Sequence, residues 1–170
     1  MDSRSAAVVL IDPKTPFNVG AAIRACSIFG VGTLRWTGNR IHAHKARGAA
    51  GSAYKGKARL PREERLRDYT WVDWRRHNTD DLVSDLYLID GFVPVCVEVS
   101  DNAEYLDEFV HPDKAVYVFG PEDGGVPKGV RTVCHRFVRI RTANRSPLNL
   151  AAAVNVVLHD RYVKQQRKHN

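Results

Sequence analysis

The chain has 170 residues, 44% of them hydrophobic and 26% charged, which is typical of one soluble globular domain with a sizeable core. Its apolar runs are too short to span a membrane and its first residues lack the pattern of a secretory signal peptide, so we expect a single domain over residues 1–170 in the cytoplasm. The net charge of +7 favours a polyanionic partner.

The first part of the chain predicts two strands, a helix between them and a long loop. Residues 6–11 are a continuous apolar run, typical of a parallel strand buried on both faces. Pro16 and Asn18 open a predicted helix, with Asn18 as its N-cap, and Gly30 closes it. A second strand is expected at residues 33–37. Residues 39–68 are rich in lysine and arginine and predict a basic loop.

The rest of the chain alternates helices and strands. We expect helices near 80–89 and at 103–109 and 148–165, and strands at 93–99, 115–119 and 137–140. Strands that alternate with helices predict an α/β domain with a mainly parallel sheet and helices on both faces.

The cysteines and histidines argue against a metal site. Cys26, Cys96 and Cys134 are far apart and odd in number, which favours three reduced, mostly buried thiols over a zinc site or a disulfide framework. The histidines are scattered, and the nearest pair, His42 and His44, has no third ligand at metal spacing. We therefore expect no metal.

Three short motifs combine polar side chains with residues that bend the backbone. They are residues 18–24 (NVGAAIR), 119–125 (FGPEDGG) and 146–150 (SPLNL). Each comes after a predicted strand, and in open parallel sheets ligands bind at the carboxyl ends of the strands. This shared placement predicts that the three motifs form one site.

Taken singly, each motif also has an ordinary structural explanation. Asn18 and Arg24 are consistent with a helix cap and a surface arginine, although the small residues 20–22 leave the first helical turn open to an approaching group. Residues 119–125 are consistent with a strand-to-turn segment, and they match neither a dinucleotide fingerprint nor a P-loop. Ser146 and Asn149 are consistent with helix capping.

Taken together, the motifs resemble those of the SpoU (TrmH-like) branch of the SPOUT superfamily over about residues 8–162. The NxGAxxR pattern at 18–24 and the FGPExxGxP pattern at 119–127 carry the resemblance. The third motif departs from the family pattern, because Pro147 stands where the family has serine and Ser146 lies one step earlier. Such proteins are AdoMet-dependent RNA ribose 2'-O-methyltransferases, so the resemblance implies that activity, AdoMet as methyl donor and a deep trefoil knot near the C-terminus.

The resemblance also implies roles for particular residues. Arg24 would be the catalytic centre, Asn18 and Glu122 would orient Arg24 or the ribose, and Asn149 would fix the third loop. AdoMet would be held by a larger set, namely Val99, Ser100, Gly120, Pro121, Glu122, Ile140, Ser146, Leu148 and Asn149. Small members of this branch imply a homodimer that grips RNA with the catalytic domain itself.

Arginine holds its proton too tightly to be a base by itself. We therefore expect Arg24 to clamp the phosphate of the target nucleotide, through which the proton leaves, and to stabilise the emerging alkoxide. The basic loop would contact RNA phosphates, although a solvated basic surface explains it too. The residues predicted to make these contacts are Arg40, Lys45, Arg47, Lys55, Lys57 and Arg59.

Two questions stay open at this point, which RNA is the substrate and whether the protein is catalytic. Small single-domain members often act on the tRNA anticodon loop, which favours tRNA over rRNA. The altered third motif leaves room for a non-catalytic RNA-binding protein of the same fold, against which the intact Asn18, Arg24 and Glu122 count.

Overall fold

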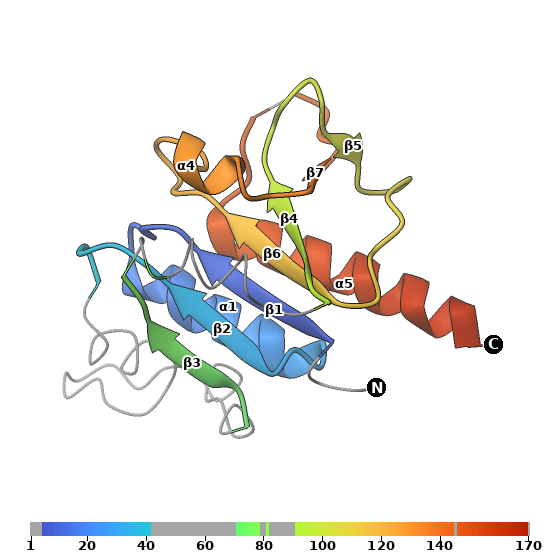
Figure 1. Ribbon diagram of the computed structural model, residues 1–170, viewed down its shortest axis with the longest axis horizontal. Coiled ribbons are helices and arrows are strands. Elements are labelled where there is room, and N and C mark those ends of the chain that lie inside the picture. Colours follow the sequence, from blue (N-terminus) through green and yellow to red (C-terminus); the bar gives the residue numbers. More distant parts are fainter. Residues whose placement is uncertain (1–4, 42–70, 79–80, 82–90, 145, 170) are drawn as a thin grey trace.

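The computed structural model describes residues 5–41, 71–78, 81, 91–144 and 146–169, and within them the chain forms one parallel sheet with helices packed against it (Figure 1). The sheet has seven strands in the order β3-β2-β1-β6-β4-β7-β5, and every pair is parallel. The strands are β1 (Ala6–Leu10), β2 (Thr33–Trp36), β3 (Asp73–Arg76), β4 (Val93–Val97), β5 (Glu104–Tyr105), β6 (Ala115–Phe119) and β7 (Arg136–Arg139). The predicted α/β class with a parallel sheet is confirmed.

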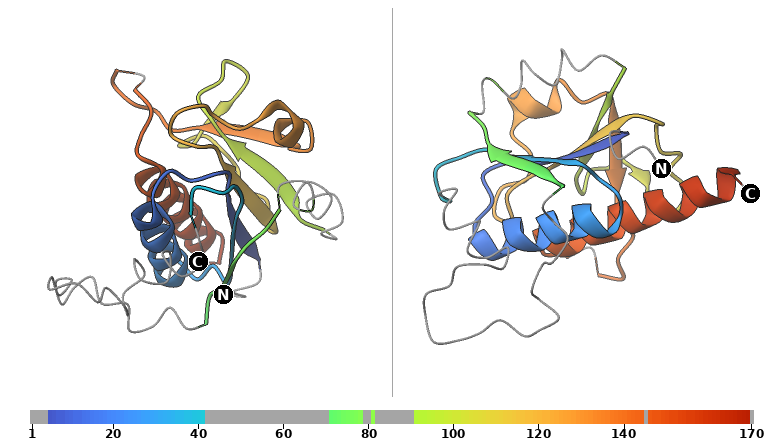
Figure 2. Two further views of the ribbon diagram at one scale, coloured as in Figure 1. Left: turned by 90° about the vertical axis from the view of Figure 1, so that its left-hand side faces the viewer. Right: turned by 90° about the horizontal axis from the view of Figure 1, so that it is seen from below.

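Helices cover both faces of this sheet, as predicted. α1 (Pro16–Ile28) and α5 (Leu150–His169) lie side by side on one face (Figure 2), and α4 (Lys128–Arg131) packs on the other. The residues of β1 alternate between two cores: Val8 and Leu10 face α1 and α5, whereas Val9 and, directly after the strand, Ile11 lie in the core that includes α4. This two-sided burial explains why the strand is apolar along its whole length.

Several local features differ from the sequence predictions. The N-cap of α1 is Thr15, whose Oγ1 accepts from the backbone N–H of Asn18 at 3.3 Å, so the Asn18 side chain is not needed for capping. The segment expected as a helix at 103–109 instead forms β5 and turns, because the backbone N–H of Leu106 bonds to the carbonyl of Arg139 at 2.9 Å. β3 was not predicted, since three of its four residues are exposed. The helix expected near 80–89 and the loop beyond Ile41 lie outside the described residues.

The side chain of Arg161 fastens α5 to the opposite end of the sheet from the motifs. It is buried, and its guanidinium donates to the carbonyl oxygens of Pro112 at 2.6 Å, Asp113 at 2.7 Å and Ser5 at 3.1 Å. These acceptors belong to the segments that lead into β6 and β1. One arginine therefore satisfies three backbone carbonyls and joins the last helix to the two central strands.

A buried polar network lies next to this arginine. His111 Nε2 is 2.8 Å from Asp160 Oδ2, and His111 Nδ1 is 2.6 Å from the hydroxyl of Tyr117. A carboxylate only accepts, so Nε2 carries the proton and Nδ1 accepts from Tyr117, whose oxygen in turn accepts from Arg161 at 3.2 Å. Burial lowers the pKa of His111 to about 4 and raises that of Tyr117 to about 12.

The three cysteines are buried and free, as predicted. Burial raises the pKa of Cys26. The part of the chain that the structure describes contains no helix both long and apolar enough to cross a membrane. It also brings no three histidine, cysteine, aspartate or glutamate side chains together as metal ligands.

Candidate active site

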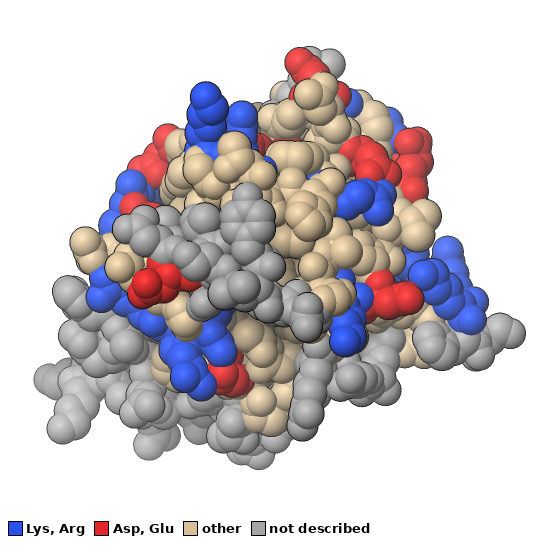
Figure 3. Space-filling model, viewed as in Figure 1, with Lys and Arg blue, Asp and Glu red and all other residues tan. Residues whose placement is uncertain are grey.

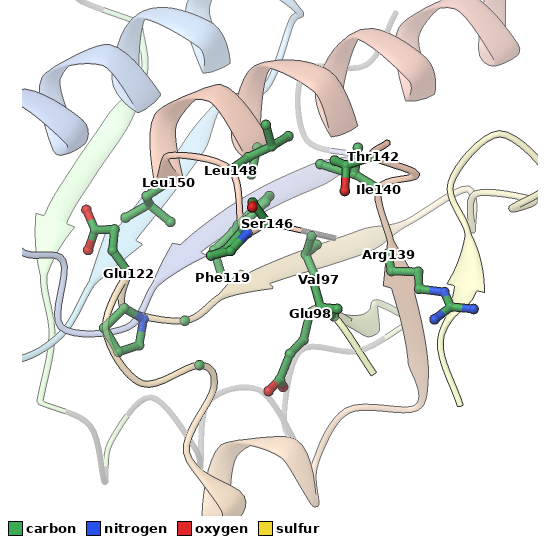
Figure 4. Close-up of a pocket in the computed structure, with 16 residues that line it drawn as sticks. Val97, Glu98, Phe119, Glu122, Arg139, Ile140, Thr142, Ser146, Leu148 and Leu150 are labelled. Carbon is green, nitrogen blue, oxygen red and sulfur yellow. The ribbon is translucent and has the colours of Figure 1, made fainter. Parts of the chain in front are cut away.

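A cavity of about 280 Å³ opens at the carboxyl ends of β4, β6 and β7 (Figure 4). Its walls come from these strand ends, from the loop that follows β6 and from the segment that leads into α5. Seven of the nine residues predicted to bind the cofactor line it, namely Val99, Gly120, Pro121, Glu122, Ile140, Ser146 and Leu148. The other two do not: Ser100 forms a turn in which its Oγ accepts from Asn102 N at 3.4 Å, and Asn149 caps α5.

The loop after β6 reaches the cavity because glycines let it fold back on itself. A Cβ on Gly120 would lie 2.3 Å from the carbonyl carbon of Gly125 and 2.4 Å from the nitrogen of Val126, so only glycine fits there. Gly125 has φ of 67°, and its N–H bonds to the carbonyl of Pro121 at 3.3 Å. Gly120 is thus explained by backbone contacts within the loop, and Gly125 by its positive φ.

Asn18 links all three motifs. Its Nδ2 donates to Glu122 Oε1, and its Oδ1 accepts from Asn149 Nδ2 at 3.1 Å. The second carboxylate oxygen of Glu122 accepts from the backbone N–H of Lys14 at 3.2 Å, and Asn149 Oδ1 accepts from Ala151 N at 3.0 Å. Because each oxygen faces a donor, this network fixes the orientation of both amides. The structure therefore places Asn18, Glu122 and Asn149 in one hydrogen-bonded line beside the cavity.

Arg24 lies apart from this line. It is half-buried on α1, does not line the cavity, and makes no hydrogen bond or ion pair with any residue that the structure describes. Arg24 lies seven residues after the exposed Phe17 on α1. The exposed Ala21 and Ile28 follow Phe17 by four and eleven residues, so these residues form one outer stripe of the helix together with Arg24. Within one chain, the structure does not bring Arg24 to Glu122.

Arg40, the predicted RNA contact nearest the motifs, is held by two carboxylates. Its Nε lies 2.9 Å from Asp12 Oδ2, and its Nη1 lies 3.0 Å from both oxygens of Asp123. The hydrogen bond from Arg40 keeps the pKa of Asp123 below its usual range. Arg40 thereby ties the loop after β2 to the second motif. The other residues predicted to contact RNA, Lys45, Arg47, Lys55, Lys57 and Arg59, lie outside the described residues.

A strained turn supports this ion-pair bridge. Asp12 has φ of 41°, which is unusual for a residue other than glycine. Its backbone N–H bonds to Thr37 Oγ1 at 3.2 Å, and Gly38, with φ of 85°, packs directly against its side chain. A Cβ on Gly38 would lie 1.9 Å from Asp12 Oδ1, so this approach requires glycine.

Three residues that line the cavity, Val97, Glu98 and Arg139, were not among the predicted site residues. Val97 supplies an apolar wall together with the motif residues Phe119 and Leu150, and Glu98 and Arg139 line the rim with side chains that point away from the centre (Figure 4). Glu98 turns toward Arg131 of α4, 3.5 Å away. The sequence signal that could have found Val97, Glu98 and Arg139 is their position at the ends of predicted strands, next to the motif residues.

Comparison with known proteins gives one family and several related folds. The profile of the SpoU rRNA Methylase family matches residues 5–159, whereas no curated protein sequence matches the chain. The SpoU methyltransferase AviRb from Streptomyces viridochromogenes has 20% identity and a TM-score of 0.76, covering 100% of this chain and 62% of AviRb. An rRNA methyltransferase from Sinorhizobium meliloti has 19% identity and a TM-score of 0.72, covering 95% of this chain and 56% of the other.

A third structure, which concerns the 2-OH methylation of C/U34 on tRNA, has 23% identity and a TM-score of 0.73. The match covers 96% of this chain and 98% of that one. The chain therefore spans about three fifths of the first two proteins and nearly all of the third. At these identities the likeness shows a shared fold, that of the SpoU structures with their trefoil knot.

Proposed function

The chain belongs to the SpoU rRNA Methylase family of AdoMet-dependent RNA methyltransferases, and on this premise we propose that it methylates a ribose 2'-hydroxyl of tRNA. The choice of tRNA rests on one observation, the sequence identity of the structural matches. The structure that concerns 2-OH methylation of tRNA has 23% identity to this chain, against 19% for the S. meliloti rRNA methyltransferase.

The residues around the cavity fit AdoMet. Val97, Phe119 and Ile140 provide apolar walls of the kind that accept an adenine ring, and the glycine-bent loop after β6 exposes backbone groups beside them. The related AviRb has been solved in complex with AdoMet. When bound, AdoMet would supply an electrophilic methyl group on a sulfonium, and Glu122 is among the residues that line the cavity that would hold it.

The polar line beside the cavity serves to position the reactants. Methyl transfer requires the 2'-hydroxyl to be aligned with the methyl group and relieved of its proton, so positioning is a large part of the catalysis. Glu122 is held from both sides, by Asn18 and by the backbone of Lys14, and can accept a hydrogen bond from the ribose without moving. Arg24 clamps the phosphate of the target nucleotide, through which the hydroxyl proton leaves, and stabilises the emerging alkoxide.

Two copies of the chain pair through the outer face of α1 and α5 in this proposal. The two helices lie side by side (Figure 2), and their outer stripes leave large apolar side chains exposed. Phe17 and Ile28 are each 60% exposed, and Val156 and Tyr162 are about 40% exposed. An apolar surface of this kind is typical of a protein interface.

This pairing accounts for the position of Arg24. The residue lies in the middle of the stripe on α1, and Leu148, which is 39% exposed, belongs both to the exposed apolar surface and to the cavity wall. A second copy on this face would bring the guanidinium of Arg24 to the edge of the partner's cavity. The site is then completed between two protomers rather than within one.

The test is to incubate the protein with labelled AdoMet and separate tRNA and rRNA pools, and to map the modified ribose. We expect label at a 2'-oxygen in tRNA. Label in rRNA alone would replace tRNA by rRNA as the substrate. Binding of RNA without AdoMet binding or transfer would favour the non-catalytic alternative, for which the altered third motif at Pro147 is the only argument.

A further inference from the structure

A second cavity, of about 480 Å³, lies at the carboxyl ends of β2 and β3, on the same edge of the sheet as the first. Gly38, Asn39, Arg76, His77 and Asn78 line it, and we refer to it as the β2–β3 notch. Three strand spacings separate β3 from β6, a distance of about 14 Å. The notch therefore lies within reach of an RNA whose ribose enters the first cavity.

Arg76 is held in the notch by neutral groups. Its Nε donates to the carbonyl of Gly38 at 2.7 Å, and its Nη2 donates to Asn39 Oδ1. Within the described residues, its Nη1 makes no hydrogen bond and its guanidinium forms no ion pair. Among the described residues, the Arg76 guanidinium is thus oriented by neutral acceptors and has no carboxylate partner.

The neighbouring arginines behave differently. Arg35 and Arg75 both pair with Asp73, at 2.5 Å and 3.0 Å, and Arg40 pairs with two carboxylates. On the face that carries β2 and β3, Lys and Arg side chains are interspersed with Asp and Glu (Figure 3), so basic charge alone does not mark a site. Arg76 is distinguished by its neutral partners.

The backbone that orients Arg76 is itself rigidly held. The carbonyl of Gly38 points at Arg76 from a turn with positive φ that packs against Asp12, and the N–H of His77 bonds to the carbonyl of Trp36 at 2.8 Å. A cation held in place by neutral acceptors, in a notch of this size, is a preorganised receptor for an anion.

We propose that the β2–β3 notch binds a backbone phosphate of the substrate RNA through Arg76, a few nucleotides from the ribose that is methylated. This inference rests on the proposed function for the identity of the anion. The same turn joins the notch to the first cavity, because Arg40 follows Asn39 directly and pairs with Asp123, the neighbour of Glu122.

The chain offers a matched control in Arg75, which precedes Arg76 on β3 and is paired with Asp73. R76A and R75A each remove one positive charge from the same strand. Binding of a labelled tRNA pool is measured between 50 and 250 mM KCl for both variants and the wild type. We expect R76A to weaken binding by about tenfold and to lower the slope of log K against log salt by about 1, as for one lost phosphate contact.

R75A is expected to change the affinity and the slope little, and AdoMet binding measured by calorimetry stays unchanged in both variants. Equal losses in R76A and R75A, or an unchanged slope in R76A, would overturn the proposal. The proposal would also be overturned if the R76A substitution abolished binding of inorganic phosphate to the notch but left RNA binding unchanged. The rRNA pool is run in parallel: the same dependence on Arg76 with rRNA alone keeps the notch and removes tRNA as the substrate.

Discussion

Acidification from pH 7.5 to 5 is expected to lower the free energy of unfolding by about 2 kcal/mol through one side chain, His111. The unfolded chain titrates this imidazole near 6.5, whereas burial lowers its pKa to about 4 in the folded protein. Between these values the unfolded state binds the extra proton, so stability rises with pH. In this range the free energy of unfolding changes by about 1.4 kcal/mol per pH unit, and the total loss of unfolding free energy by pH 4 is about 3 kcal/mol.

The assay is urea unfolding at pH 7.5, 6.5, 5.5 and 5, comparing the wild type with His111→Gln, which cannot titrate. Carboxylates that titrate below pH 5.5 contribute equally to both proteins and cancel in the difference. The stability gap between the two proteins should narrow by about 2 kcal/mol over this range. A constant gap would refute the reasoning, and so would an NMR titration of the wild type in which the His111 ring becomes protonated above pH 5.5.

Three further predictions concern the site and its surroundings. Arg24→Ala should lower methyl transfer by about 100-fold or more while AdoMet binding persists, and unchanged turnover would remove Arg24 from the mechanism. Gly38→Ala should cost about 1–3 kcal/mol of unfolding free energy in urea titration, because its Cβ strikes the aspartate side chain packed against it, whereas Gly129→Ala meets open space and should cost nothing. Ile28→Asp should yield monomers in analytical ultracentrifugation, whereas Val110→Asp, equally exposed on another surface, should not; dimers in both variants would exclude the α1/α5 face.

The sequence predicted secondary structure best for elements that are buried on both faces. β1 and β6 are continuous apolar runs, and their burial on two sides leaves no other interpretation. β3 carries exposed polar residues and exists only because β2 offers it an edge, which no local pattern reveals. The same holds for β5, whose two residues pair with β7.

The candidate site shows the same limit of local patterns. The motifs predicted that Asn18, Glu122 and Asn149 would meet, and the structure joins them by hydrogen bonds. The sequence could not show that Thr15 would take over the capping of α1, since Thr15 and Asn18 are both good caps and only the geometry decides between them. It could not show either that Arg40 would be held by carboxylates from two other loops.

The attachment of α5 through Arg161 also means that the fold can be completed only after this helix has been synthesised on the ribosome. β1 is made early, yet the face of it that carries Val8 and Leu10 is covered partly by α1 and partly by a helix that begins at Leu150. Until α5 has been made, part of this apolar sheet face therefore stays uncovered. Because the segment leading into α5 also forms one wall of the cavity, a partial chain lacks the complete cofactor site. The cavity is complete only after the helix that begins at Leu150 has been synthesised.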